Sequence, residues 1–288
     1  MLQTRIMEAK EQENKMQNII QRNFFRLLRS GAFNENEGVE PMSPFKWRRL
    51  FQMAEAQRVV PVFVSGIEKH ADDPMLNLPD DLKSILQQKG KEEESQKQTI
   101  TDEDIRLSNH ILNKRLKRII SQELESEDTS IESIDLLEIL IFNVSRMLNR
   151  GLSLDGIIRL GQYLRHRGDK VDFVKIESWL KSLKLERMAQ LQGSILMAVF
   201  GFEQDELPFV QEMEKEVMPL ITRAVSDMAK DSAEEWHFHQ TQSGFVQNNS
   251  RVLRRNVGRS MKFYPYAPWE TTSSFFTNLG RSLSEIEE

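Results

Sequence analysis

The sequence predicts an all-α protein: a multi-helix, bundle-like body with an N-terminal helical arm and an irregular aromatic and basic C-terminal tail. Residues that favour helices are abundant, whereas the 288 residues include only 13 Gly, 9 Pro and 3 Tyr. Apolar residues recur at steps of three and four along most of the chain, which is the spacing of one helix face. No segment alternates convincingly between apolar and polar residues, so we expect no strand-rich region.

The composition excludes several classes of protein. The chain has no cysteine, which excludes disulfides and thiolate metal sites and fits a reducing compartment. The first residues lack the apolar core of a signal peptide, and there is no run of about 18 apolar residues that could cross a membrane. We therefore expect a cytoplasmic protein.

Residues 1–88 form the predicted N-terminal helical region. An apolar stripe of helical spacing runs through residues 11–30. Ser43 followed by Pro44 matches an N-cap and the first position of a helix. Residues 89–98 contain no apolar residue, which predicts a charged linker or a helix extension after this region.

Residues 99–230 form the predicted central helical domain. Thr101 and Asp104 match a variant of the capping box, so we expect a helix to begin there. Residues 131–148 are apolar on several faces, which predicts a central buried helix. The other predicted boundaries are N-caps at Ser153 and Asp172, a helix end at Gly201, and a last helix over residues 206–230 that is kinked at Pro219.

Charge is spread unevenly along the chain. The net charge is −5, yet residues 251–281 contain six basic residues and one acidic residue, so a basic segment follows an acidic body. Within the body, a basic run over residues 114–118 precedes an acidic run over residues 123–128. We expect both runs to be solvated helix surface.

Residues 231–288 form the predicted tail, which we expect to pack on the body. It combines basic and aromatic residues, and this combination can contact phosphates and bases or lie on an anionic membrane surface. The simpler alternative is that the aromatic rings pack on the body while the arginines pair with acidic surface residues. The candidate partner or anion contacts are Arg254, Arg255, Arg259, Lys262, Tyr264 and Trp269.

Three segments resemble a known family. They are "SPFKWRRLFQMAEAQRVVPVFVSGI" (43–67), "LNRGLSLDGIIRLGQYLRHRGDKVDFVKIESWLKSLKLERMAQLQGSILMAVFGF" (148–202) and "MKFYPYAPWETTSSFF" (261–276). They resemble the N- and C-terminal helical regions of an uncharacterised family of bacterial nucleotidyltransferases. The resemblance implies a bacterial protein with a nucleotidyltransferase-like ancestry.

The catalytic core that this family carries between its helical regions is missing here. The resemblance implies a Gly-Ser turn ahead of an Asp-x-Asp pair that holds Mg²⁺ against the transferring phosphate. Gly193 and Ser194 lie instead within a predicted helix, and the pair Asp102 and Asp104 lies at a predicted helix start, where the helix dipole favours acids. "SIDLLEILI" (133–141) resembles the core motif, but the residues between it and the family's tail are too few for a transferase sheet.

Other candidate chemistry is sparse. His237 and His239 could supply two ligands of a metal site, but no third ligand is marked, so we assign no metal site. No phosphate-binding loop, dinucleotide fingerprint or nucleophile motif occurs. We assign no catalytic residue and no cofactor.

The sequence therefore predicts a non-catalytic helical interaction or accessory protein, related to the helical parts of that family, with a protein as the expected partner. One alternative is a cryptic metal-dependent nucleotidyltransferase whose acids, including Asp135 and Glu138, would have to converge in a pocket. Another is a peripheral membrane-surface or nucleic-acid-binding protein that acts through residues 251–281.

Overall fold

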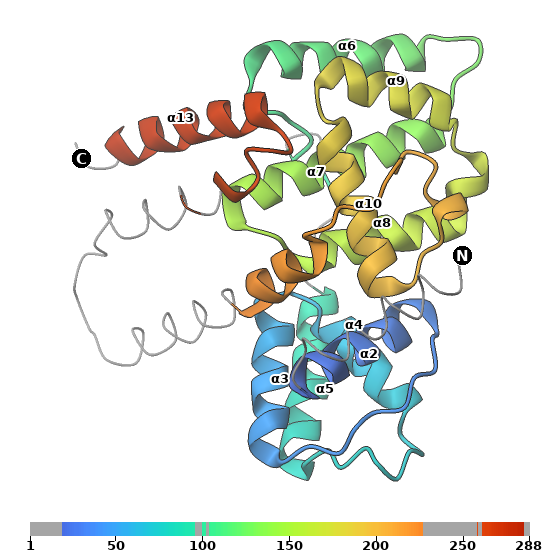
Figure 1. Ribbon diagram of the computed structural model, residues 1–288, viewed down its shortest axis with the longest axis vertical. Helices are drawn as coiled ribbons and strands as arrows, with labels where there is room; N and C mark the ends of the chain where they lie inside the picture. Colours follow the sequence, from blue (N-terminus) through green and yellow to red (C-terminus); the bar gives the residue numbers. More distant parts are fainter. Residues whose placement is uncertain (1–18, 96–99, 102–103, 227–257, 259–260, 285–288) are drawn as a thin grey trace. The chain divides into compact units, whose positions relative to one another are not determined.

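The computed structural model describes residues 19–95, 100–101, 104–226, 258 and 261–284 (Figure 1). Every regular element in these ranges is a helix, which confirms the predicted all-α class. Within the same ranges, no helix is both long enough and apolar enough to cross a membrane. The chain divides into two compact units between residues 97 and 98.

The described residues of the first unit form four helices around a small core. They are α2 (Ile19–Phe33), α3 (Pro44–Ala56), α4 (Val60–Lys69) and α5 (Asp80–Ser95). The predicted start of α3 is confirmed, with Ser43 at the N-cap and proline at the first helical position. The charged residues 89–95 form the last turns of α5. The core includes Trp47, Phe24 and Phe63, all fully buried.

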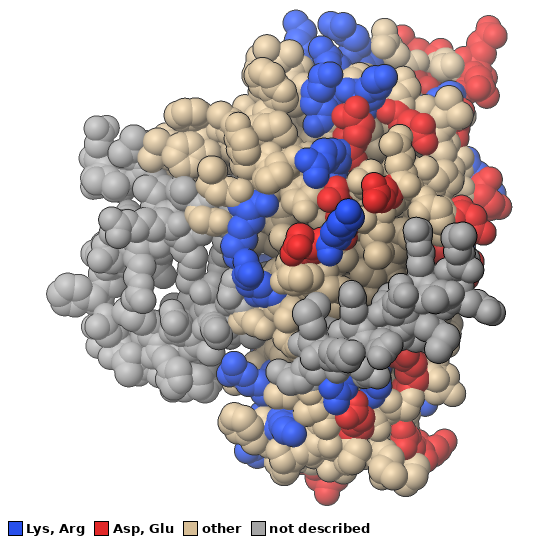
Figure 2. Space-filling view, in the orientation of Figure 1, with Lys and Arg blue, Asp and Glu red and all other residues tan. Residues whose placement is uncertain are grey.

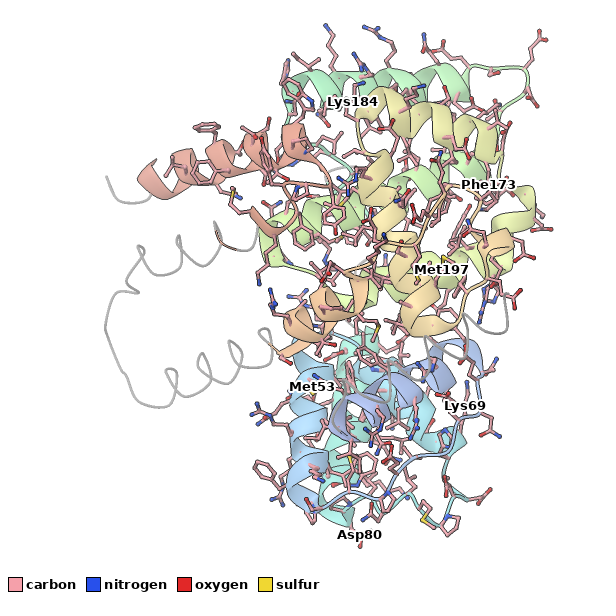
Figure 3. All side chains as sticks on the ribbon, viewed as in Figure 1. Met53, Lys69, Asp80, Phe173, Lys184 and Met197 are labelled. Atoms are coloured by element: carbon pink, nitrogen blue, oxygen red, sulfur yellow. The ribbon has the colours of Figure 1, made fainter. Side chains whose placement is uncertain are left out.

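Two glycines let α2 and α4 cross at close range. A Cβ atom on Gly31 would lie 1.9 Å from the carbonyl oxygen of Val62, and one on Gly66 would lie 2.0 Å from that of Leu27. No side chain fits between the two backbones at these points. Lys69, labelled in Figure 3, lies at the end of α4 and links it to α2 by donating to the carbonyl of Ser30 at 2.8 Å.

Side chains of α2 hold the loop that leads into α3. Arg22 donates two hydrogen bonds of 2.8 Å to the carboxylate of Glu40, and Arg26 adds a third at 2.9 Å. The hydrogen bond from Arg22 lowers the pKa of the Glu40 carboxyl below its usual value. The buried amide of Asn23 pairs with both backbone polar groups of Glu40, at 2.7 and 3.0 Å. The loop is therefore held in place by ion pairs of Glu40 with two arginines and by the hydrogen bonds between the Asn23 amide and the Glu40 backbone.

The second unit is built around one long buried helix. Its described elements are α6 (His110–Leu124), α7 (Ile131–Arg150), α8 (Leu154–Arg167), η1 (Gly168–Lys170), α9 (Phe173–Leu183), α10 (Glu186–Phe200), η2 (Gln204–Glu206), a helix over residues 217–226, and α13 (Pro268–Ser284). The central helix α7 contacts α6, α8, α9, α10 and α13 (Figure 1). The prediction of a central buried helix is therefore confirmed.

A buried amide pair joins α7, α8 and α10. The side-chain amide of Asn143 donates to the carbonyl of Gly156 at 3.0 Å and to the side-chain oxygen of Gln192 at 2.9 Å. Gln192 in turn donates to the carbonyl of Leu140 at 3.3 Å. Both side chains are almost completely shielded from solvent, so this network specifies how the three helices pack.

Several predicted boundaries hold and two do not. Asp172 caps α9 by accepting from the backbone of Lys175, and Gly201 ends α10 in the left-handed conformation, as predicted. Thr101 does donate to Asp104, at 3.1 Å from its backbone and 2.7 Å from its hydroxyl, but no helix begins there. The helix α6 begins at His110 with Asn109 as its N-cap, because Ile105 and Leu107 are drawn into the core from an irregular segment.

The predicted helix over residues 206–230 is also shorter than expected. Residues 207–216 are turns and irregular backbone, and the helix begins at residue 217. Leu207 and Val210 are fully buried in this irregular stretch, so core packing replaces helical hydrogen bonding there. Pro219 lies in the first turn of the helix, where its missing N–H has no intrahelical partner to lose, and it therefore starts the helix rather than kinking it.

Candidate interaction surface on the C-terminal helix

The predicted tail residues fall into two groups. Lys262, Tyr264 and Trp269 are among the described residues, whereas Arg254, Arg255 and Arg259 lie outside them. The candidate metal ligands His237 and His239 also lie outside the described part of the chain. Among the residues that are described, no group of three or more His, Cys, Asp or Glu side chains could hold a metal ion.

The tail is attached to the second unit at residues 263–267. Phe263 is 3% exposed and Ala267 is 1% exposed. The guanidinium of Arg187 donates to the carbonyl of Pro265 at 2.9 Å and lies 5.2 Å from the centre of the Tyr266 ring. In contrast, Tyr264 is 46% exposed and Trp269 is 64% exposed. The expected packing of aromatic rings on the body therefore applies to Phe263 but not to these two candidates.

The residues that follow form the helix α13, where the sequence predicted irregular structure, and its burial is inverted. The side that faces the body is polar: Glu270, Thr271 and Ser274 are each 1% exposed. The side that faces solvent is aromatic, with Trp269 64% and Phe276 63% exposed. An amphipathic surface helix normally buries its apolar side. The outward apolar side of α13 therefore has no partner among the described residues.

Hydrogen bonds of Glu270, Ser273 and Ser274 explain why this side faces inward, although the buried hydroxyl of Thr271 has no hydrogen-bond partner among the described residues. The carboxylate of Glu270 accepts from the backbone N–H groups of Ser108 and Asn109, ahead of α6. The amide of Asn109 donates to the hydroxyl of Ser273 at 3.0 Å, and Ser274 donates to Asn149 at 3.1 Å. Each of these groups is satisfied only if α13 keeps this rotation about its axis, so the aromatic side is held outward.

Burial shifts the titration of the central carboxyl in this contact. Desolvation raises the pKa of Glu270, although the backbone N–H groups of Ser108 and Asn109 lower it. An acid whose folded pKa lies above its unfolded value binds more protons in the folded state. Its contribution to stability is therefore present in full below the unfolded pKa and is lost as the pH rises through the folded pKa.

Glu270→Gln tests this assignment. We expect the variant to be less stable than the wild type near pH 4 by about 1–3 kcal/mol, because the amide can accept from only one of the two N–H groups and sets its own NH₂ against the other. This difference in the free energy of unfolding should become smaller towards about pH 8. At that pH the wild type has to ionise a buried carboxyl, whereas the variant has no carboxyl at this position. Urea unfolding across this range measures the difference, and a difference that grows with pH would contradict the assignment. Glu177→Gln, at an exposed carboxylate, is the control, and it should change stability little at any pH.

A second surface, on α6 and α9, is strongly basic. Figure 2 shows lysines and arginines gathered over α6, with acidic residues to one side. We define this basic face by six exposed residues: Lys114, Arg115, Lys117, Arg118, Lys181 and Lys184, the last of which is labelled in Figure 3. Arg115 donates to the carbonyl of Ser182 at the end of α9, which joins the two helices. The predicted solvation of the basic run is thus confirmed.

The acidic run that follows α6 is solvated only in part. Glu123 is 8% exposed, and its carboxylate accepts from the backbone of Ser130 and from Lys175, both at 2.8 Å. These contacts join the end of α6 to α7 and α9. The side chains of Glu125, Glu127 and Asp128 are exposed, as the sequence predicted.

An open depression of about 760 Å³ lies between α7 and α8. Glu132 and Asp135 line it from α7, and Arg159, Tyr163, His166 and Arg167 line it from α8. The hydroxyl of Tyr163 donates to the carbonyl of Glu132 at 2.9 Å and contacts Asp135 at 3.3 Å. Burial, followed by the nearby charge of Asp135, raises the pKa of Tyr163, so the phenol stays protonated.

This depression brings Asp135 together with Glu132 but not with Glu138, the other acid that the transferase alternative names. The motif-like segment 133–141 is part of the helix α7 and not a strand.

Gly193 and Ser194 lie within α10, as predicted. A Cβ on Gly193 would meet Val210 at 2.2 Å, and the Ser194 hydroxyl accepts from the backbone of Glu214. These two residues serve packing.

Two exposed apolar residues on and beside α13, Met261 and Phe276, are not among the candidates predicted from the sequence. Trp269 and Phe276 are two helical turns apart and share one side, whereas Glu270 and Ser274 are one turn apart and share another. A search for helical spacing in residues 268–284 would have found both sides. It would not have shown which side faces the body, because the buried side is the polar one.

No family model, no curated protein and no solved structure matches this chain. The likeness of its three quoted segments to the helical regions of bacterial nucleotidyltransferases therefore stays a prediction from those motifs.

Proposed function

We propose that the protein is a non-catalytic helical interaction module, and that it binds its partner through the outward side of α13. We call this side the α13 face and define it by Trp269, Thr272 and Phe276, continued by Tyr264 and Met261 ahead of the helix. The observation that carries the proposal is the inverted burial of α13, with 1% exposure at Glu270 and 64% at Trp269. Its ancestry in the helical parts of a nucleotidyltransferase family is proposed on the quoted motifs alone.

The free energy of exposing this face supports the proposal. A fully buried Phe or Trp side chain gains roughly 1.5–3 kcal/mol over an exposed one, so a rotation that packed Trp269 and Phe276 inward would be favourable if the inner side were apolar. The inner contacts of Glu270 and Ser274 instead hold the aromatic side in water. Large apolar side chains held outward in this way are typical of a binding surface.

Site-specific crosslinking tests the proposal. Trp269 or Phe276 is replaced by the photoreactive residue p-benzoylphenylalanine in the full chain, in the cells that express it naturally. Phe45 and Val174 are the matched controls, because they are apolar and 72% and 79% exposed. We expect defined crosslinked products from the two α13 positions and none above background from the controls. Equal yields at all four positions would overturn the proposal, and so would the absence of both protein and lipid adducts at the two α13 positions.

A further inference from the structure

We infer that the occupant of the α13 face is an anionic lipid bilayer surface. This inference rests on the proposed function, because it names the partner of the same face. Three features of the face carry it: the kind of apolar side chains, the way its hydroxyl groups are satisfied, and the placement of its single carboxylate.

The exposed side chains are those that enter the boundary between headgroups and acyl chains. Trp269, Phe276, Met261 and Tyr264 are 64%, 63%, 55% and 46% exposed. Tryptophan and tyrosine favour this boundary because each combines a large apolar ring with one polar group that can stay in water, and Phe and Met add apolar area. All four lie between residues 261 and 276, and Trp269 and Phe276 share one side of α13.

The exposed hydroxyl groups of the helix are already satisfied. Thr272 donates to the carbonyl of Pro268 at 2.7 Å, and Thr277 donates to that of Ser273 at 2.9 Å. A polar group that keeps its hydrogen bond within the helix loses little when water is removed from around it. The two hydroxyl donors are therefore not available for hydrogen bonds to base edges, whereas contact with a bilayer surface needs no such donors. This favours lipid over nucleic acid.

The charge on the face also suits an anionic surface. Glu270 is the only acidic residue between positions 251 and 281, and its carboxylate is turned into the protein. The outward side of residues 261–280 therefore presents no carboxylate, and Lys262 is exposed beside it. In the sequence, four arginines precede this segment between positions 251 and 259, and Arg281 follows it. Basic residues next to a membrane surface are attracted to anionic lipids, and salt weakens that attraction.

Vesicle flotation of the full chain tests the inference. The probes are vesicles of phosphatidylcholine alone and vesicles that also contain phosphatidylglycerol. We expect binding to the anionic vesicles, weaker binding to the neutral ones, and less binding at high salt. Trp269→Ser and Phe276→Ser should each weaken anionic binding by about tenfold, which corresponds to about 1.4 kcal/mol of lost apolar transfer. The matched control Phe45→Ser with Val174→Ser removes two equally exposed apolar residues and should bind as the wild type does.

Several results would overturn the inference. One is binding of the two α13 variants that equals that of the wild type. Another is that the double variant Lys117→Glu with Arg118→Glu no longer binds the anionic vesicles while the α13 variants still do. The basic face would then be the contact. Loss in the α13 variants of a dimer seen by light scattering, or of binding to an RNA oligonucleotide, would assign the face to a second copy or to nucleic acid. If the protein binds no vesicles but protein crosslinks form at Trp269, the lipid inference alone is overturned. If neither vesicle binding nor crosslinks are seen, the proposed function is overturned as well.

Discussion

Gly66→Ala is expected to destabilise the first unit by about 3 kcal/mol. The new methyl group would lie 2.0 Å from the carbonyl oxygen of Leu27, with the Leu27 carbonyl carbon at 2.9 Å and its Cα at 3.2 Å. All three atoms belong to the backbone of α2, so no side-chain rotation can make room for it. The two helices have to separate, and the buried contacts between them are lost.

The sign of this effect is informative because helix propensity acts in the opposite direction. An alanine in a helix interior is favoured over glycine by about 1 kcal/mol, so a Gly66→Ala variant without the clash would be more stable. Gly31→Ala should behave in the same way, because its methyl group would lie 1.9 Å from the carbonyl of Val62. Gly38→Ala is the control, since nothing lies within 4 Å of its Cβ position.

Urea unfolding measures these variants. It is followed by tryptophan fluorescence in a background in which Trp179, Trp236 and Trp269 are replaced by phenylalanine, so that the signal comes from Trp47, which is fully buried on α3 in the same unit. We expect the midpoint to fall for Gly66→Ala and Gly31→Ala and to stay near that of the wild type for Gly38→Ala. A Gly66→Ala protein as stable as the wild type would show that α2 and α4 do not cross at these glycines.

Asn143→Asp is expected to destabilise the second unit by about 3 kcal/mol or more near neutral pH. The replacement keeps the size of the side chain but exchanges an N–H₂ donor for a carboxylate oxygen. That oxygen would then face the carbonyl of Gly156 and the side-chain oxygen of Gln192, which now accept at 3.0 and 2.9 Å. Asn143 is 3% exposed, so water can screen little of the repulsion.

Acid should restore part of this loss, because a protonated aspartate can donate one hydrogen bond to either acceptor. Thermal unfolding followed by circular dichroism at about pH 7 and about pH 4 measures both effects. Asn149→Asp is the control: its side chain is exposed, and the change keeps the oxygen that accepts from Ser274. It removes the hydrogen bond that the amide donates to the carbonyl of Ser145, but that bond is exposed, so water can replace it. It should change stability by less than about 1 kcal/mol. Equal effects of the two substitutions would show that the buried network around Asn143 does not form.

Features with short-range causes were accessible from the sequence. Asp172 caps α9 by accepting from the backbone N–H three residues later, and Pro44 begins α3. Gly201 ends α10 because glycine adopts the left-handed conformation readily. The helix α7 was recognised as central because it is apolar on several faces. In each case the residues that decide the structure lie within one or two turns of it.

Features with long-range causes were not accessible. Thr101 and Asp104 form the predicted hydrogen bonds, yet α6 begins at His110, where the carboxylate of Glu270 binds the preceding backbone from 161 residues away. The crossing of α2 and α4 depends on two glycines that face backbone atoms of the opposite helix. A sequence pattern shows which residues share a side of a helix but not what that side meets.

The α13 face shows the same division. The sequence by itself determined an all-α protein with a C-terminal segment rich in basic and aromatic residues, because composition and helical spacing are properties of the chain alone. Only the tertiary structure decided that Trp269 faces solvent. The polar side of α13 faces the body because Ser273 accepts a hydrogen bond from Asn109 there and Ser274 donates one to Asn149. Hydrophobicity ranks residues for burial, but hydrogen bonds are directional, and here they fix which side of the helix turns inward.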